Sequence, residues 1–578
     1  MVDAWIIGSE PSERFPVWTR ANVGEVFPDP VSPFTFSIFM REEAEGGWRD
    51  ALVEMGAFTH DEFAEGRMET LGVFGSYCYL NASVTRIIGE RAPGLSAQAM
   101  DDIFFGAQPG IPPYEPAPGD LNEERTAAIG AAFAGAMTAT RLDMPLETEK
   151  LMDKLHAARP NLQAMSNREL FDHAMELFRN YFRRVFREHI GTTFLGSVPV
   201  GALTQICAAV GRPDDAMRII SGVGDVESAA PSMAMWELGR MVAASPQLTA
   251  AFDAGVTGLS GRLESVGPDG GAFTAKFGAF IDRFGARGPN EWDTRNDTWE
   301  TKPELALAAI DRMRLAPAEA DPAVRNQYMA RERKRIVAEI SAMLEGDPET
   351  KGMFEAAAHS AVLYQAGRER TKTNAVKLVH EGRMALQTMG RRMVEAGECE
   401  QWNDYSFLLV DELDRWLESP ASYKQTIRER RALDAEYRSL QEPFVFHNTI
   451  PDPSTWGRKG ADSVDLARPG DVLAGFPGCP GKVTGIARVV LDPLDPTALG
   501  PGEILVAPIT DPAWTPLFVA AGGVVVDVGA AQSHAMIVSR ELGIPCVPSV
   551  TNATRRIPDG ARILVDGDAG TVTVLATP

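Results

Sequence analysis

The stretch GGVVVDVGAAQSHAMIVSRELGIPCV, residues 522–547, decides how the carboxy-terminal part of the chain is interpreted. The apolar run from Val524 to Val528 predicts a buried strand, and the Gly/Ala-rich segment after it predicts a turn. The apolar spacing beyond the turn predicts a helix whose first turn contains His534. Backbone N–H groups at the start of a helix stabilise an anion, so a phosphoryl group on this imidazole would find hydrogen-bond donors. An isolated histidine at such a position more often caps a helix or packs in a core, so the surrounding sequence must be weighed.

Short β-branched runs surround this stretch. Gly, Pro and Asp turns separate the runs KVTGIARVVL, EILVAPI, GGVVVDV, IPCVPSV, ARILVD and TVTVLA. This pattern is typical of strands joined by tight connections. With one helix beginning near His534, residues 473–578 are predicted to form a compact α/β domain.

The preceding part of the chain has a helical pattern. From about Asp143 to Arg438 apolar residues recur at three- and four-residue spacing, as in ELFDHAMELFRNYFRRVFREHIG and VKLVHEGRMALQTMGRRMVEAG. We predict a large, mainly α-helical domain over residues 1–441. Residues 442–472 break this period and are rich in Pro, Gly, Asp and Ser, which predicts a linker. The expected fold class is therefore multidomain, with a large helical domain followed by a small α/β domain.

Composition argues against several classes of protein. The 79 acidic and 56 basic residues give a formal charge of −23, which repels nucleic acid and anionic membranes. No stretch approaches the ~20 apolar residues of a membrane span, and the amino terminus lacks the features of a secretion signal. We expect a cytoplasmic protein that binds neither nucleic acid nor membrane. The five scattered cysteines predict no disulfide framework and no metal site, so phosphate chemistry must rely on a local basic cluster.

Several segments beyond residue 472 together resemble the mobile phosphohistidine domain of the phosphoenolpyruvate-utilising enzymes. They are LAGFPGCPGKVTGIARVVLDPLDP, TDPAWTPLFVAAGGVVVDVGAAQSHAMIVSRELGIPCV and IPDGARILVDGDAGTVTVL, in the order and spacing of the family. In that family the histidine before A-x-x-x-A/S-R-E is phosphorylated and swings between two active sites. The matching residue here is His534, followed by SRE at residues 539–541. The resemblance implies that His534 carries the phosphoryl group and that the Ser533 hydroxyl supports it, where the family often has threonine.

Three weaker motifs extend the resemblance over nearly the whole chain. WTRANVGEVFPDPVSPFTFS (residues 18–37), FGARGPNEWD (284–293) and GRERTK (367–372) are similar to the acceptor-binding domain of rifampin phosphotransferase. An ATP site needs a Gly-rich loop, a lysine and metal-binding carboxylates, and no such set occurs in these residues. The resemblance therefore implies a split system like phenylphosphate synthase, in which a separate ATP-grasp-type subunit binds ATP and Mg²⁺.

The three motifs supply candidate residues for the acceptor site. Arg368 and Lys372 lie four apart and would share one face of a helix. The resemblance favours a catalytic role in holding the phosphoryl oxygens, although a solvated basic face fits the spacing equally well. The polar residues of the other two motifs are predicted to bind the substrate, one carboxylate taking the acceptor's proton. They are Glu25, Arg287, Glu291 and Asp293. Buried ion pairing is an equal alternative for the last three.

Further side chains are assigned less specific roles. His189 and His359 are spare candidate bases, each expected to be an ordinary packed or surface histidine. Aromatic residues near the amino terminus are expected to belong to the core or to line an apolar acceptor pocket. They are Phe34, Phe36, Phe39, Phe74, Tyr77 and Tyr79.

The leading hypothesis is a subunit of an ATP-dependent dikinase-type phosphotransferase. It would transfer phosphate from His534 to the hydroxyl of a small organic acceptor, with a phenol as the first candidate, as in the catabolism of aromatic compounds. AMP and phosphate would be the other products. Phosphorylation of a rifamycin antibiotic is one alternative. A non-catalytic phosphocarrier or regulatory protein is another, but a helical domain of this size is more than a carrier needs.

Overall fold

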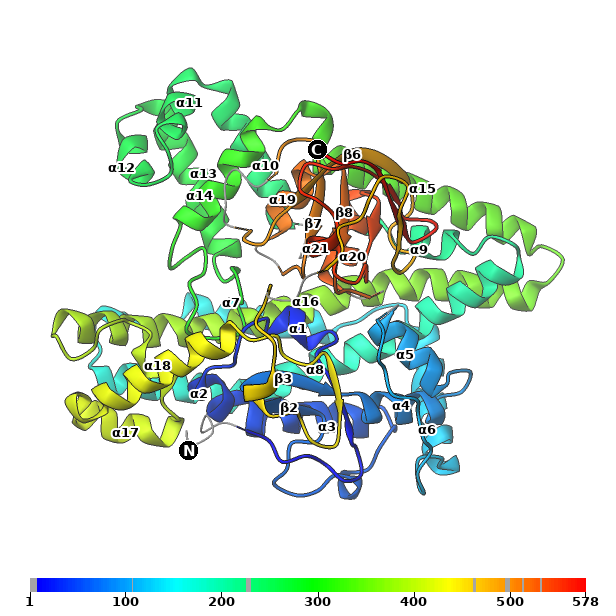
Figure 1. Cartoon of the computed structure of the whole chain (residues 1–578), viewed down its shortest axis with the longest axis horizontal. Coiled ribbons are helices and arrows are strands. Elements are labelled where there is room, and N and C mark those ends of the chain that lie inside the picture. Colours follow the sequence, from blue (N-terminus) through cyan, green and yellow to red (C-terminus); the bar gives the residue numbers. More distant parts are fainter. Residues whose placement is uncertain are drawn as a thin grey trace.

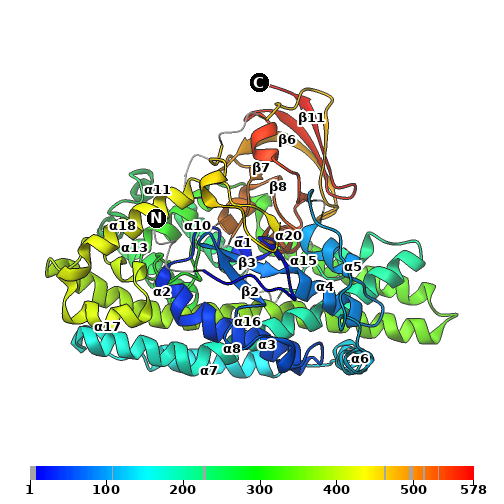
Figure 2. The same ribbon diagram turned by 60° about the horizontal axis from the view of Figure 1, so that its bottom comes forward.

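Two long helices form the base of the molecule. α8 (Asn167–Ala209) and α16 (Pro348–Glu395) pack along one another near the bottom of the view in Figure 2, where other helices lie beside them. α8 begins with a capping box at Ser166. Gly382 lets the two helices approach closely, since a Cβ there would lie 2.1 Å from the ring of Phe178. α8 is the one described helix whose length and hydropathy would suit a membrane span, but its extensive contacts with α16 are those of a core helix.

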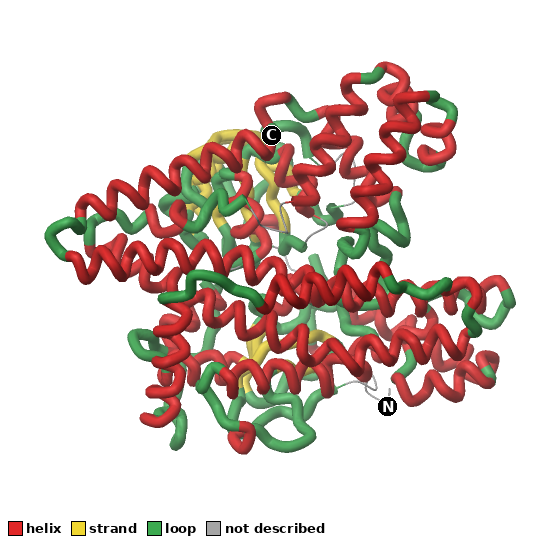
Figure 3. Tube along the Cα trace, turned by 180° about the vertical axis from the view of Figure 1, so that it is seen from behind, coloured by secondary structure: helices red, strands yellow, loops and turns green. Residues whose placement is uncertain are grey.

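The structure is a computed structural model. It describes residues 8–106, 108–224, 230–460, 464–493, 499–511, 514–530 and 533–578. Seen from behind, the strands of the carboxy-terminal part lie beside helices in the upper half of the view, and the other strands lie among helices in the lower half (Figure 3).

The amino-terminal elements cover one side of the two long helices. The helices here are α1 (Val23–Val26), α2 (Pro33–Thr35), the π-helix η1 (Phe36–Ala44), α3 (Glu45–Glu54), α4 (Ala82–Arg91), α5 (Ala97–Phe105), α6 (Glu123–Met137) and α7 (Met144–Ala157). A small antiparallel sheet in the order β2-β3-β1-β4 lies among them. Its strands are β1 (Val17–Thr19), β2 (Leu71–Phe74), β3 (Tyr77–Asn81) and β4 (Val445–His447). The sequence analysis did not predict this sheet, because its strands are only three to five residues long.

A group of helices between α8 and α16 packs against the carboxy-terminal part (Figure 1). The group contains α10 (Ala230–Ala244), α11 (Pro246–Asp253), α12 (Leu259–Glu264), α13 (Pro268–Phe284) and α14 (Glu304–Leu315). Two further helices, α9 (Asp215–Ile219) and α15 (Pro322–Met343), pack on each other beside it. The helical part is completed by α17 (Val410–Glu418) and α18 (Lys424–Arg438).

The carboxy-terminal part is a seven-stranded mixed sheet in the order β5-β11-β10-β6-β7-β8-β9. The strands β6 to β9 pair in parallel, whereas β5, β11, β10 and β6 pair antiparallel. Its elements are β5 (Val472–Ala474), β6 (Lys482–Val489), β7 (Ile504–Ala507), α19 (Thr515–Ala520), β8 (Gly523–Val526), α20 (His534–Leu542), β9 (Cys546–Val547), α21 (Ala553–Arg556), β10 (Arg562–Asp566) and β11 (Thr571–Ala576). Six of the seven strands lie within the predicted β-branched runs, whereas β5 was not predicted and begins at the last residue of the expected linker. The helix after the turn begins at His534.

The two faces of this sheet belong to different cores. Val525 of β8 packs with β10 and β11, whereas Val524 and Val526 point to the opposite face. On that face α19 and α20 share a continuous apolar cluster with α10, α13 and α14, in which Phe518 and Met313 are buried. The carboxy-terminal part is thus seated on the α10–α14 group through hydrophobic contacts.

Residues 442–472 join the helical and α/β parts. β4 lies within this segment and pairs with β1, with Phe446 opposite Trp18. Trp456 packs over Gly75 and lies beside the ring of Tyr77. The first half of the predicted linker therefore belongs to the small sheet, because its aromatic side chains are buried there. The remaining connection runs from residue 457 to β5, with residues 461–463 outside the described part.

Candidate active site

His534 lies at the edge of the sheet where two parallel strands end. It is the first residue of α20, which follows β8, and the Ser533 hydroxyl caps this helix by accepting a hydrogen bond from the Met536 N–H. Thr510 follows the neighbouring strand β7, and the carboxyl ends of parallel strands meet at one edge of a sheet. The Thr510 Oγ1 accordingly lies 3.0 Å from Nδ1 of His534, and the Thr515 Oγ1 lies 3.2 Å from Nε2. Two threonine hydroxyls thus fix the orientation of the imidazole.

The surroundings of His534 keep its imidazole uncharged. The residue is buried, and the ring of Phe518 packs edge-on against it. Burial lowers the pKa of His534 well below its ordinary value, and the positive charges of Lys372 and Arg287 lower it further. A neutral imidazole retains a nitrogen lone pair, which a nucleophile needs to accept a phosphoryl group.

Glu25 comes to this site from the amino-terminal part of the chain. It lies in the short helix α1, and its Oε2 accepts a hydrogen bond of 2.9 Å from the backbone N–H of His534. Burial raises the pKa of Glu25 to about 7, although this hydrogen bond and the charges of Lys372 and Arg368 act in the opposite direction. A carboxyl group with a pKa near neutrality suits general-base catalysis.

The predicted basic pair lies on one face of α16. Arg368 and Lys372 both line a polar pocket that also contains Glu25 and His534. The Arg368 Nη1 donates to the Glu369 carboxylate at 2.6 Å. Burial lowers the pKa of Lys372, and Glu369 offsets part of this effect. The pocket thus places two basic side chains beside His534, among the acidic side chains of Glu25, Glu291, Glu369 and Asp511.

The FGARGPNEWD segment closes the polar pocket from the loop between α13 and α14. Arg287 and Glu291 form a buried ion pair at 2.9 Å, and Glu291 lines the pocket. Asp293 is placed elsewhere. Its carboxylate accepts hydrogen bonds from Ser32 and Thr35, holding α2 against the loop. The predicted site residues that line this pocket are Glu25, Glu291, Arg368, Lys372 and His534. Arg287 does not line it but pairs with Glu291, and Asp293 supports the loop.

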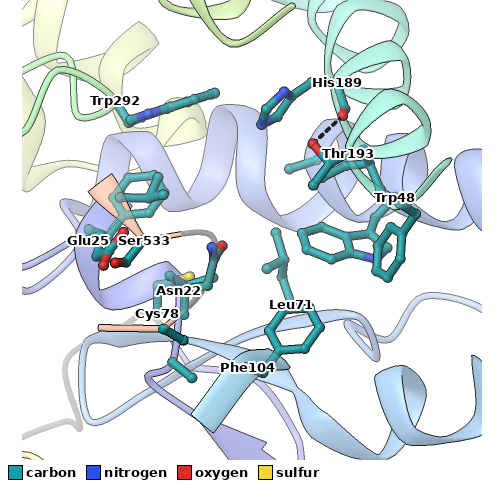
Figure 4. A pocket seen from close by; sticks show the side chains of 18 of the residues that line it. Asn22, Glu25, Trp48, Leu71, Cys78, Phe104, His189, Thr193, Trp292 and Ser533 are labelled. Atoms are coloured by element: carbon teal, nitrogen blue, oxygen red, sulfur yellow. Dashed lines mark hydrogen bonds between the residues drawn. The ribbon is translucent and has the colours of Figure 1, made fainter. Parts of the chain in front are cut away.

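A mainly apolar cavity adjoins the polar pocket (Figure 4). Its walls include Phe39, Trp48, Leu71, Phe104, Phe182 and Phe186. Asn22, Glu25, Val26, His189, Trp292 and Arg368 line both spaces, and the carboxy-terminal part contributes Ser533 to the apolar one. Glu25 and Ser533 lie side by side at one wall, with His189 and Trp292 across the cavity (Figure 4).

Of the six aromatic residues proposed from the sequence, Phe39 lines this cavity. Phe74, Tyr77 and Tyr79 pack instead with Trp18 in a separate cluster on the small sheet. Phe34 and Phe36 belong to the main helical core.

The sequence analysis overlooked several residues of the site. Asn22, Trp292, Asp511 and the two threonines around His534 all lie within motifs that carried the family resemblance, so that signal was available. His189 lies in a regular helical stretch, and only the packing of α8 against α16 brings it to the cavity. The other spare candidate, His359, is exposed on α16.

Hydrogen bonds across the interface hold the carboxy-terminal part in this position. Arg540 of α20 donates to Gln365 at 3.2 Å. The Glu541 carboxylate accepts from the backbone N–H of Val223 at 3.1 Å and from the Asn326 side chain at 3.4 Å. Among the described residues no group of three or more His, Cys, Asp or Glu side chains is arranged to hold a metal ion.

Two family models match the chain at these places. Residues 499–570 match the mobile domain of the PEP-utilising enzymes, a range that contains His534 and both of its threonine partners. Residues 189–369 match the fourth domain of rifampicin phosphotransferase. The resemblance to the PEP-utilising enzymes is thereby confirmed.

Individual relatives show the same similarity. Rifampicin phosphotransferase of Streptomyces sviceus is 31% identical over 305 residues, which cover 52% of this chain and 34% of that protein. An uncharacterised protein of Mycobacterium tuberculosis is 28% identical over 586 aligned positions, which cover 97% of this chain and 62% of the relative. The prodigiosin synthesizing transferase PigC of Serratia marcescens is 29% identical over 368 residues, 62% of this chain and 40% of the relative. The matched regions therefore span about a third to three fifths of these relatives.

Proposed function

We propose that this chain carries a phosphoryl group on His534 and transfers it to the hydroxyl of a small aromatic acceptor. One observation carries the proposal. His534 lines a polar pocket whose Arg368 and Lys372 suit a phosphoryl group, and this pocket adjoins an apolar cavity that suits an aromatic ring. A protein that only relayed phosphate would have no use for the second space.

The residues at the junction take complementary roles in the transfer. The acceptor oxygen attacks phosphorus, the bond between phosphorus and the His534 nitrogen breaks, and its electron pair returns to the imidazole. The hydroxyl proton passes to Glu25, whose raised pKa lets it hold that proton near neutral pH. Arg368 and Lys372 stabilise the charge on the phosphoryl oxygens as it redistributes. Arg287 and Glu291 hold the loop that closes the pocket.

The size of the cavity favours a small acceptor. The cavity is partly open and has a volume of about 120 Å³, close to the ~150 Å³ of an apolar cavity that accepts benzene. A phenol matches this space, whereas a macrocyclic rifamycin is far larger. We therefore favour a phenolic acceptor over the antibiotic, although rifampicin phosphotransferases are among the relatives.

The phosphoryl donor is proposed to be ATP with Mg²⁺, bound by a separate ATP-grasp-type subunit. His534 is buried where it lies, so it has to leave this position to be phosphorylated. The carboxy-terminal part would swing about the connection between residue 457 and β5. AMP and phosphate would be the other products, as expected for a dikinase-type reaction.

The test combines the chain with its ATP-binding partner, ATP, Mg²⁺ and a panel of acceptors. We expect AMP and an aryl phosphoester with phenols, neither product with His534→Ala, and no phosphorylated rifamycin. A second arm needs no partner, because phosphoramidate can phosphorylate the histidine chemically before a phenol is added. Phosphorylation of rifamycin and not of phenols would overturn the acceptor assignment, and a phosphohistidine that no small molecule discharges would favour a carrier.

A further inference from the structure

His189 presents to the apolar cavity a ring nitrogen for which the described part of the chain supplies no hydrogen-bond donor. The residue lies on α8, and its imidazole points into the cavity beside Trp292 (Figure 4). The Nδ1 atom lies 3.1 Å from the Oγ1 of Thr371 on the facing helix α16. That hydroxyl donates its hydrogen to the carbonyl oxygen of Arg368 at 2.9 Å. Because the Thr371 hydroxyl donates its single proton to this carbonyl, its oxygen can only accept a hydrogen bond from Nδ1–H of His189.

The tautomer of His189 follows from this chain of hydrogen bonds. Nδ1 carries the proton, so Nε2 keeps a bare lone pair at the end of the ring farther from the backbone. No described residue donates a hydrogen bond to this nitrogen. Burial and the charges of Arg368 and Lys372 lower the pKa of His189 to about 3, so Nε2 stays unprotonated at neutral pH.

The group that pairs with Nε2 differs from the hydroxyl that is phosphorylated. A hydroxyl has one proton to donate, and the proposed mechanism gives that proton to Glu25. His189 is too weak a base to replace Glu25, and it lies across the cavity from it (Figure 4). An uncharged acceptor at the wall of an apolar cavity can pair with a donor on a ligand, and a ligand that supplies this donor gains affinity and specificity.

We propose that the acceptor is an aromatic compound with a second hydrogen-bond donor, a hydroxyl or an amine, which binds Nε2 of His189. This inference rests on the proposed function and narrows its class of acceptors. In it His189 is a positioning residue that selects the substrate and orients its ring, while the reactive hydroxyl faces Glu25 and His534.

Binding to the unphosphorylated chain tests the inference without any transfer step. Calorimetry would compare catechol, resorcinol and hydroquinone with phenol and with the monomethyl ether of each diol. We expect at least one diol to bind about 10-fold more tightly than both phenol and its own ether, the effect of one good hydrogen bond. Diols that bind no better than phenol would overturn the inference and leave the phenolic acceptor intact, whereas no binding by any probe would overturn both.

Two variants of His189 distinguish the role of its Nδ1 from the role of its Nε2. His189→Asn can still donate to Thr371 but lacks an acceptor at the Nε2 position, so it should bind the diol no more tightly than it binds phenol. His189→Gln places an amide oxygen near Nε2 and should keep much of the preference. A preference that survives in the Asn variant would overturn the role of His189. If either variant fails to fold, the comparison of diol and ether on the wild-type chain still decides.

Discussion

The Glu25 carboxylate accepts a 2.9 Å hydrogen bond from the backbone N–H of His534, a residue 509 positions later in the chain. The bond joins a short helix of the amino-terminal part to the first residue of α20. It places the proposed base beside the proposed phosphoryl carrier. Each of the following predictions depends on this arrangement.

Glu25→Gln should slow acceptor transfer by ~10²- to 10⁴-fold, the usual contribution of a general base. The carboxylate form is the active one, and its pKa is raised to about 7. In the wild type the rate should therefore rise with pH up to about 7 and then level, whereas the variant should lose this dependence. Single-turnover transfer from phosphorylated protein is the measurement. Glu42→Gln, at an exposed side chain, is the matched control, and an unchanged pH profile in Glu25→Gln would rule out the base.

His534→Ala should abolish phosphorylation of the chain by its ATP-binding partner and leave the fold intact. The imidazole is the nucleophile, and the threonines that hold it cannot replace a nitrogen. Intact-mass analysis would show one added phosphoryl group on the wild type and none on the variant. His359→Ala, which removes an exposed histidine, should still be phosphorylated. A phosphate located on any other residue would refute the assignment.

Arg368→Ala and Lys372→Ala should accept phosphate normally yet pass it on ~10²- to 10³-fold more slowly, because they are proposed to stabilise the transferring group only at this pocket. Phosphohistidine would then accumulate. A chase of labelled phosphate from the protein to the acceptor measures the second step alone. Lys377→Ala is the control on the same helix, since Lys377 pairs with Asp153 away from the pocket. Rapid chase in both site variants would mean that the pair is only a basic face.

The packing of the carboxy-terminal part against the helical part should become less stable as pH rises from about 4.5 to 7. Burial raises the pKa of both Glu25 and Glu541 to about 7, so the seated state binds more protons than a state in which these groups are solvated. Between pH 4.5 and 7, each group should lower the free energy that holds the two parts together by up to ~1.4 kcal/mol per pH unit. Above pH 7 there should be no further change. Energy transfer between dyes on the two parts would follow the change. Glu541→Gln should remove its share of the slope, and a slope of opposite sign would contradict the interpretation.

The sequence by itself determined the carboxy-terminal part and its histidine. The run Val524–Val528, the Gly/Ala turn and the helix starting at His534 are encoded by neighbouring residues, so local pattern is enough to predict them. The face that Arg368 and Lys372 share likewise follows from helical period. The three-residue strands β1 and β4 escaped prediction because they depend on distant partners: β4 pairs with β1, more than 400 residues away in the chain, and β1 also pairs with β3.

Only the tertiary structure decided what each polar residue of the helical part does. Glu291 and Asp293 are two positions apart in one motif, yet one lines the pocket and the other holds Ser32 and Thr35, because the loop turns between them. No sequence motif marks His189 as a site residue. The hydrogen bond of its Nδ1 to Thr371, between α8 and α16, is what leaves Nε2 unprotonated. The charge, the burial and the hydrogen-bond partners of each polar side chain depend on tertiary contacts between distant segments. Local sequence patterns do not predict those contacts.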